Sequence, residues 1–542
     1  MLSSRPRIVV IGALAAATLA CGQPVVRAGV TATAPAAPSA TATVRLPLAT
    51  VGRPADFTLA VEYGVPGLAA LYAGTGVQSV KPQIEFGVWG NLEPTPGEYN
   101  WQALDQLVAE YQAQGFTHQQ LLISADSPWA AIDPRKNPMP RPEYLDEYAA
   151  FVGRVVERYD GDGNADAPGL LTGIHDYGIE REFTGFFGGS AAEYTQLLRT
   201  AYPVIHAADP QARVLLVGLM MVDVFDGAPD PAEVERRLAT TPSYRKSAAD
   251  IRSILAACDA YDLVDLHSLG HYTEISPTTA WLQAELAAAG CDRPIWIGDS
   301  FSMSLLLGFD QHVFAPATAA DREAVSAVLQ AAADPGSPDH ATALAWQQAE
   351  EARGLVQKAV VAAGAGLRGI NLGNLEDWAT HVPAFDKLLV LGMGTAVNMG
   401  MAASEVTLER YGRLPYEGDA FARVRLPAAV RPAYSALSLV NEQIGAHSAV
   451  RALDLGQGVW AYVFETPAGP VWVLWYDDGH LYLPGQPRPT TTVVLEVGGD
   501  QARVTRTPTV TSSSPPLGEM MAAPGGTLNL TLDSTPVFVS RP

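Results

Sequence analysis

The sequence predicts an α/β fold in which a (β/α)8 TIM barrel is followed by a C-terminal all-β sandwich. Short strand-like apolar runs alternate with helical patterns about eight times over most of the chain. After about residue 447 the helical patterns stop, and strand-like runs with turn signals between them follow one another. A doubly wound open sheet is the alternative for the first part, but no glycine-rich phosphate loop follows the first strand.

The expected elements follow in chain order. The eight barrel strands are apolar runs at 57–61, 80–89, 120–125, 173–182, 213–219, 263–268, 294–299 and 367–373. The helical patterns between them include 101–114, 142–159, 191–208, 278–289 and 341–363. Residues 300–338 after the seventh strand are expected to be loop-rich and to form a wall or lid at the rim. A helix at 431–444 leads into sandwich strands at 459–464, 471–476, 490–497, 502–507, 528–532 and 537–540.

Composition limits the function classes. The chain has 542 residues, of which 48% are hydrophobic and 17% charged, so a large core is expected. The formal net charge of -22 disfavours nucleic acid and anionic membranes as partners. A neutral substrate suits this charge, although the charge alone does not select one.

The N-terminal stretch up to Cys21 has the features of an export signal. Arg5 and Arg7 precede an apolar run at 8–20 that is too short to span a bilayer comfortably. The Thr-Leu-Ala sequence before Cys21 resembles a bacterial lipoprotein signal, in which the cysteine becomes the lipidated first residue. We therefore expect an exported protein of the bacterial cell envelope, anchored to the outer face of a membrane only through this lipid. Cleavage elsewhere, with secretion of a soluble protein, is the alternative.

Four segments are expected along the chain. Residues 22–50 are rich in Ala, Thr and Pro and cannot bury much apolar surface, so they predict a flexible tether. The segments are a signal peptide with a lipoprotein-type cleavage site at 1–21, the tether at 22–50, the barrel at 51–430, and a helix plus β-sandwich at 431–542. A tether behind a lipid anchor would lift the folded part off the membrane.

Cysteine and histidine spacing gives no sign of a metal centre. Cys258 and Cys291 can pair in an oxidising compartment or remain buried free thiols. No CxxC, Cys/His or HExxH spacing occurs, so no metal is expected. A serine nucleophile lacks support because no Gly-x-Ser-x-Gly elbow is present.

Two carboxylates stand at the ends of distant expected strands. Glu182 closes Tyr-Gly-Ile-Glu-Arg-Glu on the fourth strand, and Asp299 closes Pro-Ile-Trp-Ile-Gly-Asp on the seventh. In a parallel barrel both strand ends meet at the C-terminal rim, where such barrels do their chemistry. Two carboxylates facing one cleft form the minimal apparatus for breaking a glycosidic bond. Glu180 has the same strand parity as Glu182 but is a weaker candidate, expected to be buried and structural.

Several segments together resemble the clan-A (β/α)8-barrel glycoside hydrolases, in particular those related to β-xylosidases and α-L-iduronidases. The resemblance covers roughly residues 55–540 and rests on W-G-N-L-E-P-T-P-G-E-Y-N-W at 89–101, S-A-D-S-P-W-A at 124–130, and 193–210, 267–272 and 431–437. It implies that Glu182 is the general acid/base and Asp299 the nucleophile or base. It also implies an oligosaccharide or glycoside substrate and no cofactor.

Two positions depart from the family pattern. Arg181 stands where the family has an Asn that binds the sugar 2-hydroxyl. An Arg would hold a nearby carboxylate ionised, which opposes a general acid, or it would recognise an acidic sugar. Asp299 replaces a Glu and is shorter by one methylene. The gap between the carboxylates would then widen enough for a water, as in inverting enzymes, or the attack would fail.

The remaining rim candidates each have a structural alternative. Tryptophan rings can stack on sugars or cap the barrel core. His267 and Tyr272 can bind hydroxyls, orient the nucleophile or serve a structural role, and Asp126 can cap a turn. The candidate substrate-binding residues are Arg181, Glu85, Trp89, Asp126, Trp129, His267, Tyr272 and Trp378. Two other functions use the same scaffold: a catalytically inactive carbohydrate-binding protein and a structural protein of the cell surface.

Overall fold

The computed structural model describes residues 51–52, 57–134, 136–221, 224–225, 227, 229–240, 246–300, 319–373, 408–414, 418–424, 430–512 and 516–542. The expected signal peptide, Cys21, the tether and Trp378 lie outside these residues. Within the described part of the chain, no helix is both long and apolar enough to cross a bilayer.

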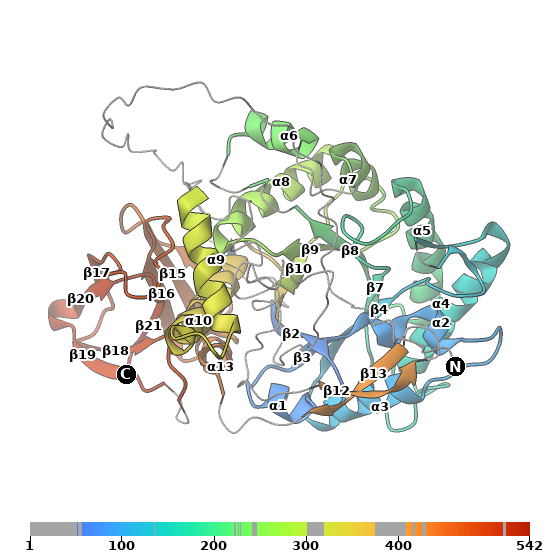
Figure 1. The fold of residues 1–542 in the computed structure, drawn as a ribbon, viewed down its shortest axis with the longest axis horizontal. Coiled ribbons are helices and arrows are strands. Elements are labelled where there is room, and N and C mark those ends of the chain that lie inside the picture. Colours follow the sequence, from blue (N-terminus) through green and yellow to red (C-terminus); the bar gives the residue numbers. More distant parts are fainter. Residues whose placement is uncertain are drawn as a thin grey trace.

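Eight parallel strands close into a barrel (Figure 1). They are β2 (Thr58–Gly64), β3 (Ser79–Pro82), β4 (His118–Ile123), β7 (Asp176–Ile179), β8 (Arg213–Met220), β9 (Leu263–Ser268), β10 (Ile295–Ser300) and β11 (Gly369–Leu372). β11 pairs with β2 in register Ile370 to Leu59, which closes the ring. The predicted barrel is therefore confirmed.

The second strand is shorter than the expected 80–89. β3 ends at Pro82, whose ring nitrogen has no hydrogen to donate to a neighbouring strand. A 3-10 turn, η1 (Ile84–Gly87), and a short helix, α2 (Trp89–Leu92), follow it. Glu85 and Trp89 therefore lie on turns after the strand and not in it.

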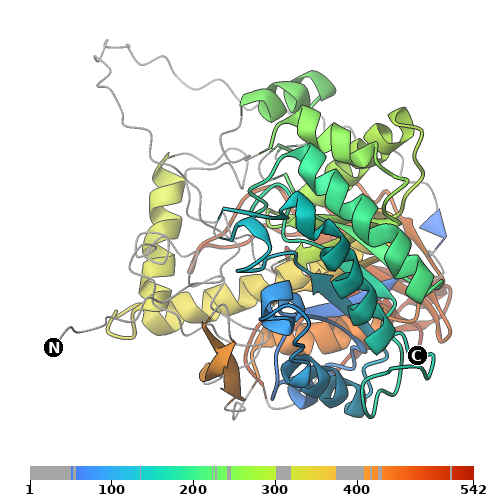
Figure 2. The same cartoon turned by 90° about the vertical axis from the view of Figure 1, so that its right-hand side faces the viewer.

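Helices surround the barrel, as the turned view in Figure 2 shows for those coloured blue to green. Those with bounds near the expected ones are α3 (Gln102–Ala113), α4 (Leu145–Tyr159), α5 (Ala191–Ala208), α8 (Ile275–Ala288) and α10 (His340–Gly364). The other helices described before α10 are α1 (Ala69–Ala73), α6 (Pro231–Thr240), α7 (Ala248–Leu255) and α9 (Ala319–Ala333). α5 starts where the sequence predicts because Ser190 and Glu193 form a capping box.

The region 300–338 is not all loop. Helix α9 occupies Ala319–Ala333, and its sequence is rich in alanine, the strongest helix former. The expectation of a loop-rich segment was wrong for this part, because alanine content outweighs the Gly and Pro that flank it. Residues 301–318 lie outside the described residues.

The C-terminal region is a β-sandwich, as expected. Its larger sheet is antiparallel and contains, in order, β1 (Val51–Gly52), β14 (Ala449–Ala452), β15 (Val459–Thr466), β16 (Gly469–Tyr476), β21 (Val537–Ser540), β18 (Gln501–Arg506) and β19 (Glu519–Ala522). A ribbon of β17 (Thr491–Glu496) and β20 (Thr527–Leu532) covers it. Leu528, Leu530 and Leu532 of β20 are buried while their neighbours are more exposed, the period-two pattern of a strand with one buried face.

Two smaller hairpins complete the described strands, β5 (Ala131–Asp133) with β6 (Asn137–Pro140), and β12 (Leu408–Leu414) with β13 (Gly418–Val424).

Helix α10 joins the barrel to the sandwich. Its Lys358 donates a hydrogen bond to the carbonyl oxygen of Ser268 in the barrel, at 2.7 Å. Its Trp346 indole donates to the carbonyl oxygen of Tyr482 in the sandwich, at 2.8 Å. The connecting helix α13 (Pro432–Ile444) packs along α10. In Figure 1 the sandwich, coloured red, lies beyond α10 on the side away from the barrel strands.

Cys258 and Cys291 form a disulfide with a Cα–Cα distance of 6.1 Å and a sequence separation of 33. We expect replacement of both residues by serine to lower the free energy of unfolding by about 2–4 kcal/mol, because the cross-link restricts the unfolded chain. Urea unfolding with and without a reducing agent measures this loss. The reducing agent should leave the double-serine variant unchanged, and an unchanged wild-type midpoint on reduction would contradict the prediction.

Candidate active site

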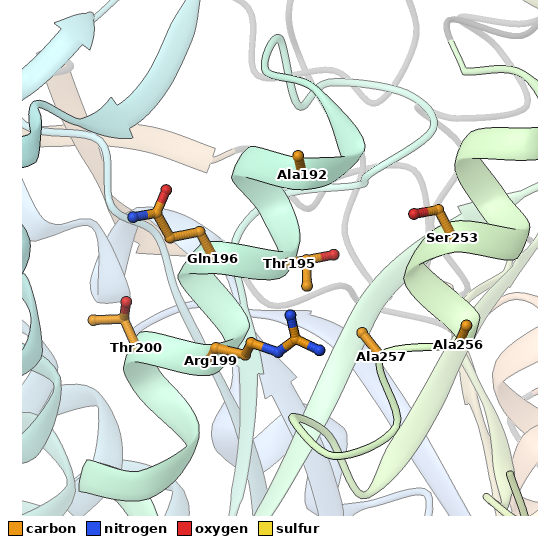
Figure 3. Close-up of a pocket in the computed structure, with 8 residues that line it drawn as sticks. All are labelled: Ala192, Thr195, Gln196, Arg199, Thr200, Ser253, Ala256 and Ala257. Carbon is orange, nitrogen blue, oxygen red and sulfur yellow. The ribbon is translucent and has the colours of Figure 1, made fainter.

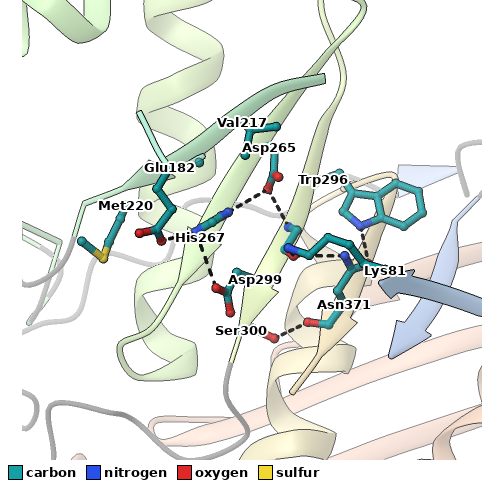
Figure 4. Close-up of polar contacts among 12 residues, drawn as sticks. Lys81, Glu182, Val217, Met220, Asp265, His267, Trp296, Asp299, Ser300 and Asn371 are labelled. Atoms are coloured by element: carbon teal, nitrogen blue, oxygen red, sulfur yellow. Dashed lines mark hydrogen bonds and ion pairs between the residues drawn. The ribbon is translucent and has the colours of Figure 1, made fainter. Parts of the chain in front are cut away.

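The closed barrel brings Glu182 and Asp299 to one rim (Figure 4). Glu182 follows β7, and Asp299 lies near the C-terminal end of β10. Their side chains are buried, with only 6% of Glu182 and 2% of Asp299 exposed. One carboxylate oxygen of each lies within 4.8 Å of the other, and both lie within that distance of a His267 nitrogen. The two carboxylates of the sequence analysis therefore share one site.

His267, at the end of β9, lies between the two carboxylates. Its Nδ1 contacts Glu182 Oε1 and lies 3.8 Å from Asp299 Oδ2. Its Nε2 faces Asp265 Oδ1 at 3.5 Å. Burial opposes a charge on the ring, but Asp265 and Glu182 outweigh it and raise the pKa of His267 well above its usual 6.5. At neutral pH the site therefore holds a buried imidazolium.

A second cation lies below the rim. Lys81 Nζ contacts Glu62 Oε1 and donates a hydrogen bond to the carbonyl oxygen of Gly298. Burial opposes the charge of Lys81, but Glu62, Asp265 and Asp299 together raise its pKa. Burial and the nearby Asp299 raise the pKa of Glu62 well above its usual range. Lys81 is thus a buried cation whose charge is stabilised by three neighbouring carboxyl groups.

Tyr63 fixes one oxygen of Asp299. Its hydroxyl donates a hydrogen bond to Asp299 Oδ2 at 2.8 Å. Burial and the charge of Asp299 raise the pKa of Tyr63 well above 10.0, so the hydroxyl stays protonated and remains a donor. Sequence reasoning missed this residue, although an aromatic residue at the end of the first barrel strand was an available signal.

Lys81 and Asp265 were missed as well. Lys81 is a lone cation in an otherwise uncharged strand, and Asp265 shares the strand parity of His267. Both patterns indicate side chains that point into the barrel. Asp265 Oδ1 also accepts a hydrogen bond from the backbone nitrogen of Gly298 at 2.9 Å, which fixes it beside His267.

Arg181 lies beside Asp126 at the rim. Among the described residues, its ion pair is with Asp126, at 3.4 Å between Nη2 and Oδ2. The cation in contact with Glu182 is His267. The guanidinium is directed to Asp126, and the effect of Arg181 on the general acid and its recognition of an acidic sugar stay predictions.

Glu180 is a structural residue, as expected. It is buried and has a φ of 69°. It accepts hydrogen bonds from Ser124 Oγ and from the backbone nitrogen of Arg181, both at 3.0 Å. This conformation turns the chain after β7 and directs Glu182 toward the site.

Gly218 on β8 makes room for Glu182. Its φ is +86°, and a Cβ atom there would lie 2.5 Å from Glu182 Cα. A side chain at this position would be strained and would displace the backbone that carries the carboxylate.

Trp89 cannot stack on a sugar in this structure. It is fully buried and packs edge-on against Trp129 at 4.8 Å and face-on against Phe151 at 5.5 Å. Its indole nitrogen donates to Glu93 Oε2 at 2.7 Å. The substrate-binding expectation for Trp89 was wrong, because neighbouring aromatic side chains cover the ring. Trp129 is half-buried in the same cluster.

Tyr272 lies at the junction of barrel and sandwich. It is buried, its hydroxyl donates to Asp477, and it accepts a hydrogen bond from the Trp475 indole at 3.0 Å. The expectation that it binds substrate was wrong, because residues of the sandwich cover its ring and bind its hydroxyl. Glu85 is buried in the 3-10 turn η1. Its role in substrate binding stays a prediction.

The structure contains a small cavity beside the site and a larger groove away from it. A cavity of about 10 Å³, with room for roughly one water, lies beside His267 and is lined also by Ser268 and Glu274. A surface groove of about 570 Å³ runs between α5 and α7, away from the carboxylates, and is lined by Thr195, Arg199 and Ser253 (Figure 3).

Glu182, His267 and Asp299 are also residue types that bind transition metals.

We expect replacement of Asp265 by Asn to lower the pKa of His267, because the imidazolium loses the carboxylate that stabilises it most. A raised folded-state pKa adds stability that is complete below 6.5 and is lost as pH rises through the folded value. The variant should therefore lose this contribution at a lower pH than the wild type. NMR titration of the histidine ring and urea unfolding at several pH values measure both effects. An unchanged His267 titration would contradict the prediction.

The fold is a closed parallel barrel with two buried carboxylates at one rim. No protein-family model and no curated protein matches this sequence. Solved structures match it in fold. A family 39 glycoside hydrolase from Bacteroides cellulosilyticus WH2 has a TM-score of 0.53 and 13% identity over 90% of this chain and 81% of its own.

Two further structures are similar. The family 39 enzyme from Xanthomonas axonopodis pv. citri has a TM-score of 0.52 and 13% identity over 91% of this chain and 96% of its own. A glucosidase from Croceicoccus marinus has a TM-score of 0.51 and 11% identity over 91% of this chain and 96% of its own. At these identities the likeness is one of fold: this chain has a barrel fold similar to those of the solved glycoside hydrolases.

Proposed function

We propose that this protein is an exported glycoside hydrolase in which Glu182 is the general acid/base and Asp299 the nucleophile. The observation that carries the proposal is the pair of buried carboxylates, with one oxygen of each within 4.8 Å of the other at the rim. The nearest carboxylate oxygens are therefore closer together than the roughly 6.5–9.5 Å between the carboxyl groups of inverting enzymes, which favours the shorter separation of about 5–5.5 Å in retaining ones. We therefore propose hydrolysis with retention.

The hydrogen bonds suggest which oxygens react. Among the described residues, Asp299 Oδ1 and Glu182 Oε2 are buried and have no hydrogen-bond partner. Tyr63 and His267 hold the other oxygen of each carboxylate. Asp299 Oδ1 would attack the anomeric carbon while Glu182 gives a proton to the leaving oxygen. Water, activated by Glu182, would then hydrolyse the glycosyl-enzyme.

His267 supplies the proton in this scheme. An ionised Glu182 cannot act as an acid, and the imidazolium contacts its Oε1. The Glu182–His267 pair therefore holds one proton, which moves from His267 Nδ1 to Glu182 when the leaving group needs it.

The charge balance at the rim favours a neutral sugar. Asp126 neutralises Arg181, the cation that was a candidate for recognising an acidic sugar. We therefore propose a neutral oligosaccharide or glycoside as substrate.

A panel of aryl glycosides and neutral oligosaccharides tests the activity. We expect release of the aglycone or of new reducing ends, and proton NMR should show that the first product keeps the anomeric configuration of the substrate. An inverted first product would rule out the roles assigned to Asp299. Failure to cleave any member would overturn the proposal.

A carbohydrate-binding protein without catalysis is the second candidate. It is favoured by His267, which lies between the carboxylates where a substrate atom would have to enter. Calorimetry would then detect saccharide binding, with no reducing ends over time.

We also propose that the protein is anchored outside the membrane by a lipid on Cys21. The lipoprotein-like sequence motivates this, and the Cys258–Cys291 disulfide fits an oxidising compartment. Replacing Cys21 by Ser should move the protein from the membrane fraction to the soluble fraction. An unchanged distribution would contradict the anchor.

A further inference from the structure

A second group of carboxylates lies in the loop between α4 and β7, at the opposite end of β7 from Glu182. The loop reads Asp-Gly-Asp-Gly-Asn-Ala-Asp from Asp160 to Asp166. Acidic or amide side chains therefore occupy every second position. The proposed hydrolase chemistry uses none of them.

The loop gathers its carboxylates at one point. One oxygen each from Asp160, Asp162 and Asp166 lies within 4.8 Å of the other two. The backbone nitrogens of Gly161 and Gly163 donate to the two oxygens of Asp166, at 3.1 and 2.8 Å. The three carboxylates thus converge on one point, with Asp160 buried, Asp166 half-buried and Asp162 exposed.

Asp160 gives an independent sign of a missing ligand. It is 7% exposed, and its Oδ2 is buried with no hydrogen-bond partner in the described chain. Its Oδ1 accepts only from the backbone nitrogen of Asp162, at 3.2 Å. A buried carboxylate oxygen without a donor is costly, so native proteins normally supply a donor or a cation.

Among the described residues, no basic side chain is paired with these three aspartates. Within the described residues, Asp160, Asp162 and Asp166 form no ion pair, and the adjacent Arg158 is paired with Asp105 at 2.6 Å. Glu157 adds a fourth carboxylate and accepts a hydrogen bond from the Asn164 amide. The loop therefore concentrates negative charge that the protein itself does not neutralise.

We propose that Asp160, Asp162 and Asp166 bind a calcium ion. Calcium takes several carboxylate and carbonyl oxygens in flexible geometry, and this set contains oxygen ligands alone. Asp160, Asp162 and Asn164 also repeat the Asp-x-Asp-x-Asn spacing at the start of EF-hand calcium loops. The ion would satisfy Asp160 Oδ2 and remove the repulsion among the three carboxylates.

The bound ion would fix the connection into β7. The loop is closed by backbone hydrogen bonds from Ala167 to Arg158 and from Ile174 to Tyr159, at 2.8 and 2.7 Å. A calcium ion at the end of α4 would hold this closure and so stabilise the strand that leads to Glu182. The site is separate from the proposed active site and does not depend on its function.

The test is calcium titration by calorimetry of the full protein after treatment with EDTA, together with thermal unfolding with and without calcium. We expect saturable binding of one ion with a Kd at or below the range of about 10⁻⁴–10⁻³ M found for extracellular calcium modules, and a higher Tm with calcium. Magnesium alone should bind more weakly, because it prefers a smaller octahedral site that keeps several waters.

Variants localise the ion. Asp162→Asn and Asp166→Asn should each weaken calcium binding at least tenfold and abolish the Tm increase. Asp146→Asn, an exposed residue at the other end of α4, should bind calcium as the wild type does. Anomalous scattering from wild-type crystals soaked in calcium should place the ion among the three aspartates, independently of how the variants fold. Absence of binding, or equal binding by both loop variants and the wild type, would overturn the proposal.

Discussion

Replacing Glu182 with Gln is expected to lower kcat for an unactivated glycoside by about 10²–10⁴, the usual contribution of a general acid/base. The amide keeps the size and the contact with His267 but can neither give nor take the proton. Aryl glycosides with acidic phenols should lose much less in the first step, because their leaving group needs little protonation. This difference between substrates separates loss of acid catalysis from loss of folding.

Glu98→Gln is the matched control. Glu98 is exposed on a loop, and the same chemical change there should leave kcat unchanged. Circular dichroism and thermal unfolding should show that both variants are folded. If Glu182→Gln cleaves unactivated glycosides as fast as the wild type, Glu182 is not the acid/base.

Replacing Lys81 with Met is expected to lower the free energy of unfolding by about 3–5 kcal/mol. The change removes one partner of a buried ion pair and leaves the carboxyl group of Glu62 without its cation. Asp265 and Asp299 lose the same positive charge. Urea unfolding at neutral pH measures the loss.

Lys358 provides a control of the same residue type and burial. Burial lowers the pKa of Lys358 to about 7, so at neutral pH its ammonium group is half neutral and contributes less as a charge. Lys358→Met loses mainly the hydrogen bond to Ser268, a cost of about 0.5–1.5 kcal/mol. A larger loss for Lys358→Met than for Lys81→Met would contradict the assignment of charges.

Sequence patterns predicted the strands and helices because they are local. The apolar runs of the eight barrel strands and the capping box before α5 are visible without knowledge of the fold. The ends of β7 and β10 were then enough to pair Glu182 with Asp299, because a closed parallel barrel has one C-terminal rim.

The surroundings of the carboxylates depend on contacts between distant residues. Tyr63 reaches Asp299 across 236 positions, and Lys81 reaches the carbonyl of Gly298 across 217. No pattern of neighbouring residues in the sequence predicts contacts over such separations. The sequence around Trp89 did not predict its burial either. A tryptophan near the rim has the same local sequence whether a sugar or another aromatic ring covers it.

The contact between Tyr272 and the sandwich has a consequence for protein engineering. Tyr272 follows the strand that carries His267, and its hydroxyl is bound by Asp477 and Trp475. A barrel cut free near residue 445 would expose this ring and a buried hydroxyl to water. The C-terminal region therefore cannot be exchanged like a detachable carbohydrate-binding module, and chimaeras should keep both parts from the same parent.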